Sequence, residues 1–93
     1  MIEKTSENNI EVSFVIPCLN EGRTLKEVIT CCHKAGKFLN SYEIIVADNM
    51  SKDNSVEIAK KEKAKVVKVK EKGYGSTLHA GIKKAKGTYV VMG

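Results

Sequence analysis

Two short hydrophobic runs constrain the fold of this chain more than any other feature. Val12–Pro17 reads VSFVIP and Glu43–Asp48 reads EIIVAD, and β-branched or aromatic residues dominate both runs. Runs that are apolar on both faces are typical of parallel strands covered by helices, because neither face of such a strand meets water. The chain is therefore expected to form a sheet with helices packed against both sides.

The segment between these runs has the periodicity of an amphipathic helix. A helix is expected over Thr24–Ala35, and Gly36 supplies a C-terminal stop. The apolar positions that share one face of this helix are Leu25, Val28, Ile29, Cys32 and Ala35. A strand, a helix and a second strand in this order form the crossover unit of a parallel sheet.

The rest of the chain repeats this alternation. Asp53 is expected to be the N-cap of a short helix that runs through about Glu62. A strand at Val66–Lys70, a helix at Ser76–Lys86 and a strand at Thr88–Met92 follow. The sequence thus predicts a Rossmann-like α/β fold in the order βαβαβαβ, with a mainly parallel sheet and the first strand at its centre.

The third predicted strand differs from the others. Lys68 and Lys70 alternate with Val67 and Val69, so one of its faces is polar. Lysine on a strand is typical of a sheet edge, where it discourages pairing with another chain. We therefore expect this strand at an edge of the sheet.

Composition limits the chain to one small domain. With 93 residues, 42% of them hydrophobic and 29% charged, it is neither disordered, collagen-like nor membrane-embedded. The polar start, MIEKTSENNI, lacks the apolar core of a signal peptide, and three cysteines make a poor disulfide scaffold. These features predict a cytoplasmic protein with reduced thiols, which can lie peripherally on the cytoplasmic face of a membrane.

The net charge of +5 is concentrated, since seven of the 16 basic residues fall within Lys60–Lys72. This segment lacks the interleaved aromatic side chains that single-strand binders use for stacking, so no nucleic-acid partner is expected. A solvated helix end and edge strand accounts for the lysines, and a weak attraction to anionic lipid headgroups is compatible with them.

Two known nucleotide-binding motifs are not found at the positions where their folds require them. A dinucleotide fold needs G-x-G-x-x-G after the first strand, but Gly73 and Gly75 follow the third. No window matches the phosphate loop G-x-x-x-x-G-K-[ST], and no cysteines or histidines have metal-ligand spacing. In open α/β sheets ligands bind beyond the carboxyl ends of strands, so the loops at 17–23, 48–53 and 71–75 are the candidate site.

Three motifs in these loops carry a resemblance. In chain order they are VSFVIPCLNEGRTL, YEIIVADNMSKDNS and KGYGSTLHAGIKKAKGTYVVMG. Together they resemble the N-terminal part of a family 2 glycosyltransferase of the GT-A fold, and most closely the dolichyl- or polyprenyl-phosphate glucosyl- and mannosyltransferases. The resemblance implies an enzyme that transfers a hexose from a UDP- or GDP-sugar to an acceptor such as a polyprenyl or dolichyl phosphate.

The resemblance also implies roles for particular residues. Glu21 would accept hydrogen bonds from ribose hydroxyls, Asp48 would accept an N–H of the base, and Lys72 would complement the diphosphate. A charge-assisted bond to a carboxylate suits a base N–H because such bonds are short and directional. The nucleotide-sugar contacts expected by resemblance are Pro17, Leu19, Asn20, Glu21, Asp48, Asn49, Ser51, Lys72 and Gly73.

Departures from the family pattern restrict what can be assigned. Asn49 replaces a frequent second Asp, and Met50 replaces a turn glycine, which costs roughly 1 kcal/mol if φ is positive there. The family's metal-binding D-x-D would follow Gly93. We therefore expect a polar extension at 1–10, the nucleotide-binding half of the domain at 11–93, and no catalytic or metal-binding residue. The Mg²⁺ or Mn²⁺ of such enzymes would have its ligands elsewhere.

Plainer interpretations remain open for the same residues. Asp53 can be a helix cap, Asp48 a turn former, and Glu21 a partner of a helix dipole. The competing function is a non-catalytic nucleotide-binding or interaction module. A sheet that ends at Tyr89–Met92 is also expected to expose that edge and to self-associate.

Overall fold

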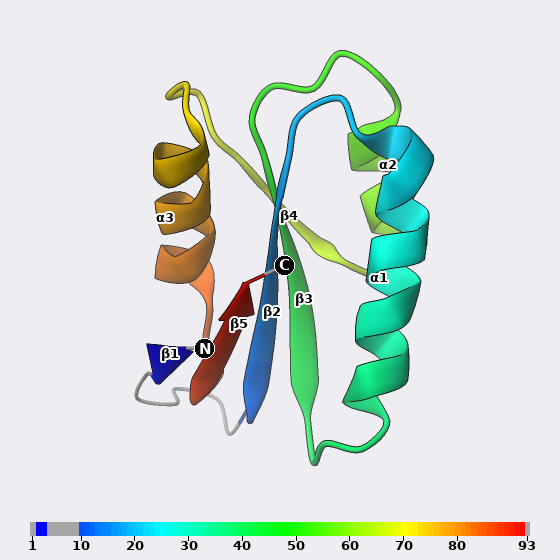
Figure 1. Ribbon diagram of the computed structural model, residues 1–93, viewed down its shortest axis with the longest axis vertical. Helices are drawn as coiled ribbons and strands as arrows, with labels where there is room; N and C mark the ends of the chain where they lie inside the picture. The colour runs from blue at the N-terminus through cyan, green and yellow to red at the C-terminus, as the bar shows by residue number, and fades with distance from the viewer. Residues whose placement is uncertain (1, 4–9, 93) are drawn as a thin grey trace.

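The computed structural model describes residues 2–3 and 10–92, which form a five-stranded sheet with helices on both faces (Figure 1). The strands lie in the order β1-β5-β2-β3-β4. The elements in chain order are β1 (Ile2–Glu3), β2 (Val12–Cys18), α1 (Gly22–Gly36), β3 (Tyr42–Asp48), α2 (Ser55–Lys61), β4 (Lys65–Lys68), α3 (Tyr74–Lys84) and β5 (Tyr89–Met92).

The predicted α/β fold is confirmed. Strands β5, β2, β3 and β4 are parallel, β2 lies at the centre of the sheet, and the lysine-bearing β4 lies at an edge. The boundaries differ from the predicted ones by one or two residues. Helix α3, for example, begins at Tyr74 rather than Ser76, because the backbone turns into the helix at Gly73, whose φ is +117°.

Each face of the sheet has its own hydrophobic core. Helices α1 and α2 lie on one face, where Leu25, Ile29 and Ala59 pack against the side chains of β2 and β3. Helix α3 covers the opposite face, where Leu78 and Ile82 pack against a second set of strand residues. Both faces of the central strands are therefore buried, as the apolar runs predict. No helix in the described part of the chain is long and apolar enough to cross a membrane.

Helix α3 approaches the sheet closely at one glycine. A Cβ atom at Gly81 would lie 2.5 Å from Cγ1 of Val15, which is too close, and 3.2 Å from Cβ of Ala47, which is a tight contact. A Cβ atom at Gly75, six residues earlier on the same helix, would meet nothing within 4 Å. The small residue at Gly81 thus sets the distance between α3 and the sheet.

Strand β1 is a feature that the sequence analysis does not predict. It pairs antiparallel with β5, placing Ile2 opposite Val90 and Glu3 opposite Tyr89. Part of the β5 edge that was expected to be open is therefore paired. A two-residue strand has no periodicity from which it could be recognised. Self-association through this edge stays a prediction.

A buried carboxylate connects the strands at the end of the sheet opposite the three loops. Glu43 on β3 is only 6% exposed. Its carboxylate accepts hydrogen bonds from the Ser13 hydroxyl at 2.5 Å, from the Lys65 ammonium at 2.9 Å and from the Lys86 backbone N–H at 2.7 Å. The Ser13 hydroxyl in turn accepts the Gly87 N–H at 2.8 Å. One side chain thus joins β2, β3, β4 and the chain that follows α3.

These contacts determine the ionisation of Glu43. Burial alone would raise the pKa of Glu43, but the hydrogen bonds from Ser13, Lys65 and Lys86 outweigh it and lower the pKa below its ordinary value. A carboxyl group with a lower pKa in the folded state stabilises the fold above its unfolded pKa. That contribution is lost as the pH falls through the folded pKa.

We therefore expect Glu43→Gln to lower the free energy of unfolding by about 1–3 kcal/mol at neutral pH, because it removes a charge that accepts three hydrogen bonds. The difference from the wild type should shrink as the pH falls, since the wild-type carboxylate is then neutralised as well. Urea unfolding across the acid range measures both effects. Glu27→Gln, an exposed change on α1, is the control and should stay within about 0.5 kcal/mol of the wild type at every pH.

The two glycines of α3 give a second test with opposite signs. Gly81→Ala should destabilise the fold by about 1–3 kcal/mol, because the added methyl group forces α3 away from Val15 and Ala47. Gly75→Ala should stabilise it by about 0.5–1 kcal/mol, because the site is open and alanine favours a helix. Thermal unfolding of the two variants measures this, and a loss of stability in both would contradict the assigned helix–sheet distance.

Candidate functional site

Three loops leave the sheet at the same level. In the register of the parallel strands, Cys18 of β2 lies opposite Asp48 of β3, and Asp48 lies opposite Lys68 of β4. These are the last residues of the three strands. The loops that follow them therefore emerge side by side at the carboxyl edge, as expected for the ligand site of an open α/β sheet.

Asp48 closes a turn within the second loop. Its side chain is only 3% exposed, and its two oxygens accept hydrogen bonds from the Ser51 backbone N–H at 3.0 Å and the Ser51 hydroxyl at 2.5 Å. The turn passes through Met50, whose φ is +59°, so the positive φ considered at this position is confirmed. A non-glycine residue in this region costs roughly 1 kcal/mol or more, which the bonds around it offset.

Asn20 joins the first loop to the second. Its backbone is also left-handed, with φ of +51°, a conformation that asparagine tolerates better than most residues. The Asn20 N–H donates to the Ser51 hydroxyl at 2.8 Å, and its side-chain oxygen accepts the Lys52 N–H at 2.6 Å. Asn20 therefore holds the two loops together.

Asn49 joins the second loop to the third. Its side-chain amide donates to the carbonyl oxygens of Val69 at 3.0 Å and Glu71 at 2.7 Å. Its backbone N–H donates to the carbonyl of Cys18 at 2.8 Å. An aspartate here could not donate these side-chain bonds, so the departure at Asn49 has a structural reason.

Asp53 is not the N-cap of α2, which corrects the sequence prediction. The N-cap is Asn54, and its side chain makes no capping bond. The Asp53 carboxylate instead accepts the Ser55 hydroxyl and N–H and, at 3.1 Å, the N–H of Gly22 at the start of α1. The bond from the Ser55 hydroxyl is the main reason that the pKa of Asp53 is lowered, and the bonds from backbone N–H groups add to it. Asp53 thus ties the starts of two helices together.

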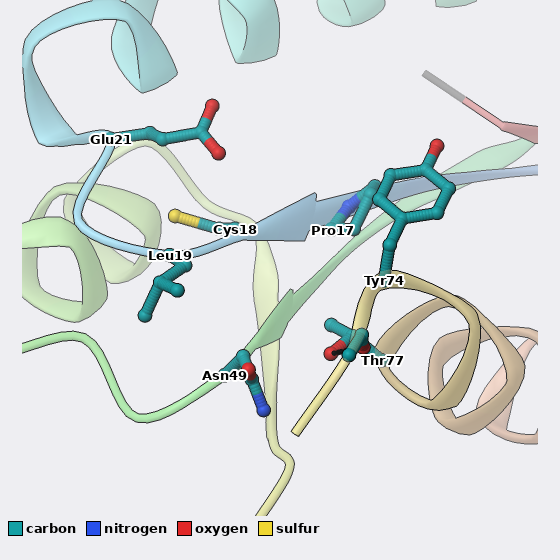
Figure 2. A pocket seen from close by; sticks show the side chains of 8 residues that line it. Pro17, Cys18, Leu19, Glu21, Asn49, Tyr74 and Thr77 are labelled. Atoms are coloured by element: carbon teal, nitrogen blue, oxygen red, sulfur yellow. Dashed lines mark hydrogen bonds between the residues drawn. The ribbon is translucent and has the colours of Figure 1, made fainter. Parts of the chain in front are cut away.

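A cavity of about 210 Å³ opens between the first and third loops (Figure 2). Tyr74, at the start of α3, extends beside Pro17, and its side chain is 68% exposed. Glu21 reaches in from the start of α1, and its carboxylate forms no ion pair with the rest of the described chain. The lining residues are Pro17, Cys18, Leu19, Glu21, Asn49, Gly73, Tyr74 and Thr77.

A second cavity of about 530 Å³ adjoins the first, and the two share Leu19, Asn49 and Gly73. The cations Lys52, Lys70 and Lys72 line this second cavity. Its other residues are Leu19, Asn20, Asn49, Met50 and Gly73. The joined space therefore has an acidic group on one side and three ammonium groups on the other, with apolar side chains between them.

Seven of the nine predicted contact residues line this joined space. Asp48 and Ser51 do not line it; Asp48 is buried, and the two side chains bond to each other within the turn. Tyr74, Thr77, Lys52 and Lys70 line it without having been predicted as contacts. Tyr74 could have been recognised as an aromatic between two glycines at a helix start, whereas Thr77 has no sequence signal of its own.

The thiol at the cavity wall is not activated. Burial raises the pKa of the Cys18 thiol above its ordinary value, and hydrogen bonds with Ser55, Glu21 and Ser51 only partly oppose this. All three cysteines are free thiols, as predicted. Across residues 2–3 and 10–92, no three His, Cys, Asp or Glu side chains lie close enough together to hold a metal ion. The described residues do not fit a metal centre.

The role of Asn49 gives a direct test. Asn49→Asp should replace two donated hydrogen bonds by repulsion between a carboxylate and two carbonyl oxygens, lowering the free energy of unfolding by about 1–3 kcal/mol. Amide hydrogen exchange should also accelerate in the third loop, at 69–73. Asn54→Asp is the control, since that side chain makes no capping bond. Equal exchange rates in the two variants would contradict the role given to Asn49.

Comparison with known proteins agrees with this architecture. The chain is 39% identical over 71 residues to an uncharacterized glycosyltransferase of Mycobacterium tuberculosis, covering 76% of this chain and 30% of that protein. It is 38% identical over 89 residues to the dolichol-phosphate mannosyltransferase of Pyrococcus furiosus, covering 89% of this chain and 25% of that protein. The chain therefore spans less than a third of the length of these relatives.

The fold also matches solved structures. Glucosyl-3-phosphoglycerate synthase from Mycobacterium tuberculosis, in complex with Mn²⁺, UDP and glucosyl-3-phosphoglycerate, superposes with a TM-score of 0.77 at 26% identity. The match covers 90% of this chain and 33% of that one. The sequence model of glycosyl transferase family 2 matches residues 13–92, which include all three loops of the site. This chain belongs to glycosyl transferase family 2.

Proposed function

We propose that residues 11–93 form the nucleotide-binding part of an enzyme that transfers a hexose from a UDP- or GDP-sugar to a polyprenyl or dolichyl phosphate. The observation that carries this proposal is the joined space at the carboxyl edge of the sheet, to which all three family motifs contribute lining residues. The mannosyltransferase relative, whose name specifies dolichol phosphate, supports the lipid acceptor.

The charges of the joined space suit the two ends of a nucleoside diphosphate. The exposed Glu21 carboxylate is free to accept hydrogen bonds from ribose hydroxyls. Lys72, beside Gly73 in the second cavity, would complement the diphosphate, and Lys52 and Lys70 add positive charge there. The carboxylate and the ammonium groups lie on different sides of the space, so a bound nucleotide is favoured with its ribose near Glu21 and its diphosphate near the lysines.

Asp48 is proposed to hold the base. Its two bonds from Ser51 leave carboxylate lone pairs available, since an ionised carboxylate has about four acceptor sites. The same bonds fix its orientation, so an N–H of a base could bind without any reorganisation of the side chain. Because Asp48 is buried and does not line the joined space, the turn at 48–51 would have to move before a base could reach this carboxylate.

The transfer chemistry needs groups that the described residues do not supply. A divalent cation is expected in this family, and the similar synthase is described in complex with Mn²⁺ and UDP. No cluster in the described part of this chain fits such an ion, so no step through it is derived. The chain's own contribution is to bind and orient the nucleotide against α3 and the second loop.

The test is a titration with UDP and GDP followed by amide NMR. We expect shifts at Asn20–Glu21, Asp48–Ser51 and 72–75, and loss of these shifts in Asp48→Ala. Shifts confined to other parts of the chain would contradict the site. The preferred nucleotide in this titration also decides between UDP- and GDP-sugars.

Two control variants separate binding from turn structure. Ser51→Ala removes the hydroxyl bond that Asp48 accepts but keeps the backbone N–H bond and the carboxylate, so it should weaken nucleotide binding less than Asp48→Ala does. Glu57→Ala removes an exposed carboxylate on α2 and should leave binding unchanged. If Ser51→Ala abolishes binding as completely as Asp48→Ala, Asp48 acts through the turn and not through the base.

A further inference from the structure

The lysines of this protein are far more concentrated than its fold requires. Residues 60–86 carry ten of the chain's 16 basic residues and only two carboxylates, those of Glu62 and Glu71. All ten lysines are exposed. Lys65 pairs with Glu43, and the other nine form no ion pair within the described residues. Lysines on the edge strand alone are enough to discourage its pairing with another chain. The further lysines on the flanking helices therefore need another explanation.

Several of these lysines lie around strand β4. Strand β4 is one of the two edge strands, with α2 before it in the chain and α3 after it, on opposite faces of the sheet (Figure 1). Lys68, Lys70 and Lys83 line one hollow between β4 and α3, and Lys63 lies two residues before β4. We call this surface the lysine edge and define it by Lys63, Lys68, Lys70 and Lys83.

The lysine edge includes a hollow that shares only Lys70 with the nucleotide space. A cavity of about 510 Å³ opens between the end of β4 and α3, and Lys68, Lys70 and Lys83 are its cations. Ser76 and His79 of α3 also line it, and Glu71 is its only carboxylate. A hollow of this size, with three ammonium groups and a hydroxyl, suits a phosphate-bearing headgroup.

The chemistry of the cations indicates which class of partner this surface would bind. All the basic residues of the lysine edge are lysines, which act as point charges without the planar, bidentate geometry of arginine. The one Phe, Tyr or Trp residue in 60–86 is Tyr74, which lines the nucleotide space instead, and the imidazole of His79 is the one ring that lines the hollow. A surface with many point charges and a single imidazole fits a plane of negative charge better than a nucleic acid, whose single strands bind through repeated stacking.

We propose that the lysine edge docks this protein onto an anionic phospholipid membrane, with a headgroup phosphate in the hollow between β4 and α3. Lys70 belongs to both the hollow and the nucleotide space, so docking would hold the mouth of the nucleotide site at the membrane surface. The docking itself does not depend on the nucleotide-sugar transfer proposed above.

Sedimentation with lipid vesicles tests this proposal. The full chain should bind vesicles that contain phosphatidylglycerol and should not bind vesicles of phosphatidylcholine alone. Binding should fall steeply between about 0.05 M and 0.5 M salt, because screening shortens the range of the attraction. Soluble glycerophosphate at the same phosphate concentration should not displace the protein, since it offers no plane of charge.

The variants assign the binding to this surface. Replacing Lys63, Lys68 and Lys83 together by Gln should lower the partition coefficient about a hundredfold, at about fivefold for each lysine near the membrane. The matched control replaces Lys26, Lys34 and Lys37 of α1 and its C-cap by Gln, an equal change in net charge on exposed positions elsewhere. The control should lower the coefficient about threefold or less.

The proposal would be overturned if the protein did not bind anionic vesicles at low salt, or if the two triple variants lost vesicle binding equally. Displacement by soluble glycerophosphate, or tighter binding to an oligonucleotide or an acidic peptide, would also overturn it. Circular dichroism checks the fold of each variant. If the triple variant of the edge does not fold, Lys68→Gln and Lys83→Gln are measured singly, and each should lose about fivefold. Asp48→Ala should bind vesicles normally, which separates this proposal from the nucleotide site.

Discussion

The hydrogen bond from Ser13 to Glu43 is the interaction on which the rest of the structure depends. The two residues are opposite each other on β2 and β3, and both are buried. A slip of one residue would turn Glu43 to the other face of the sheet, away from Ser13, Lys65 and the end of α3. The bond therefore fixes the register of the central strands. Because of that register, β2, β3 and β4 end level, and their loops can contact one another.

The functional edge is a set of loops that hold one another in place. Asn20 bonds the first loop to the second, Asn49 bonds the second to the third, and Asp53 bonds the second to the start of α1. These side chains are short, so their bonds form only where the loops are already close. The motifs of a family 2 glycosyltransferase in this chain thus include residues that shape the site as well as residues that line it.

The sequence predicted the fold well because the fold follows from patterns that extend over many residues. The apolar runs at Val12–Pro17 and Glu43–Asp48 and the lysines of β4 indicated the order of the layers and the edge strand. Features that rest on one or two residues escaped prediction, such as β1 and the N-cap at Asn54. At the site, the resemblance to family 2 glycosyltransferases pointed to Glu21 and Lys72, and both line the joined space. It could not show that Asp48 and Ser51 do not line that space, since that depends on the path of the turn through Met50.

The two left-handed residues in the loops, Asn20 and Met50, have a consequence for the speed of ligand binding. Their unfavourable backbone conformations are adopted when the chain folds, and the loop-to-loop bonds maintain them without a ligand. The entropy of ordering these loops is therefore lost during folding and not when a nucleotide arrives. A ligand then meets loops that are already ordered, so its association is governed by diffusion, by charge and by the movement of the turn at 48–51 that the proposed contact with Asp48 requires.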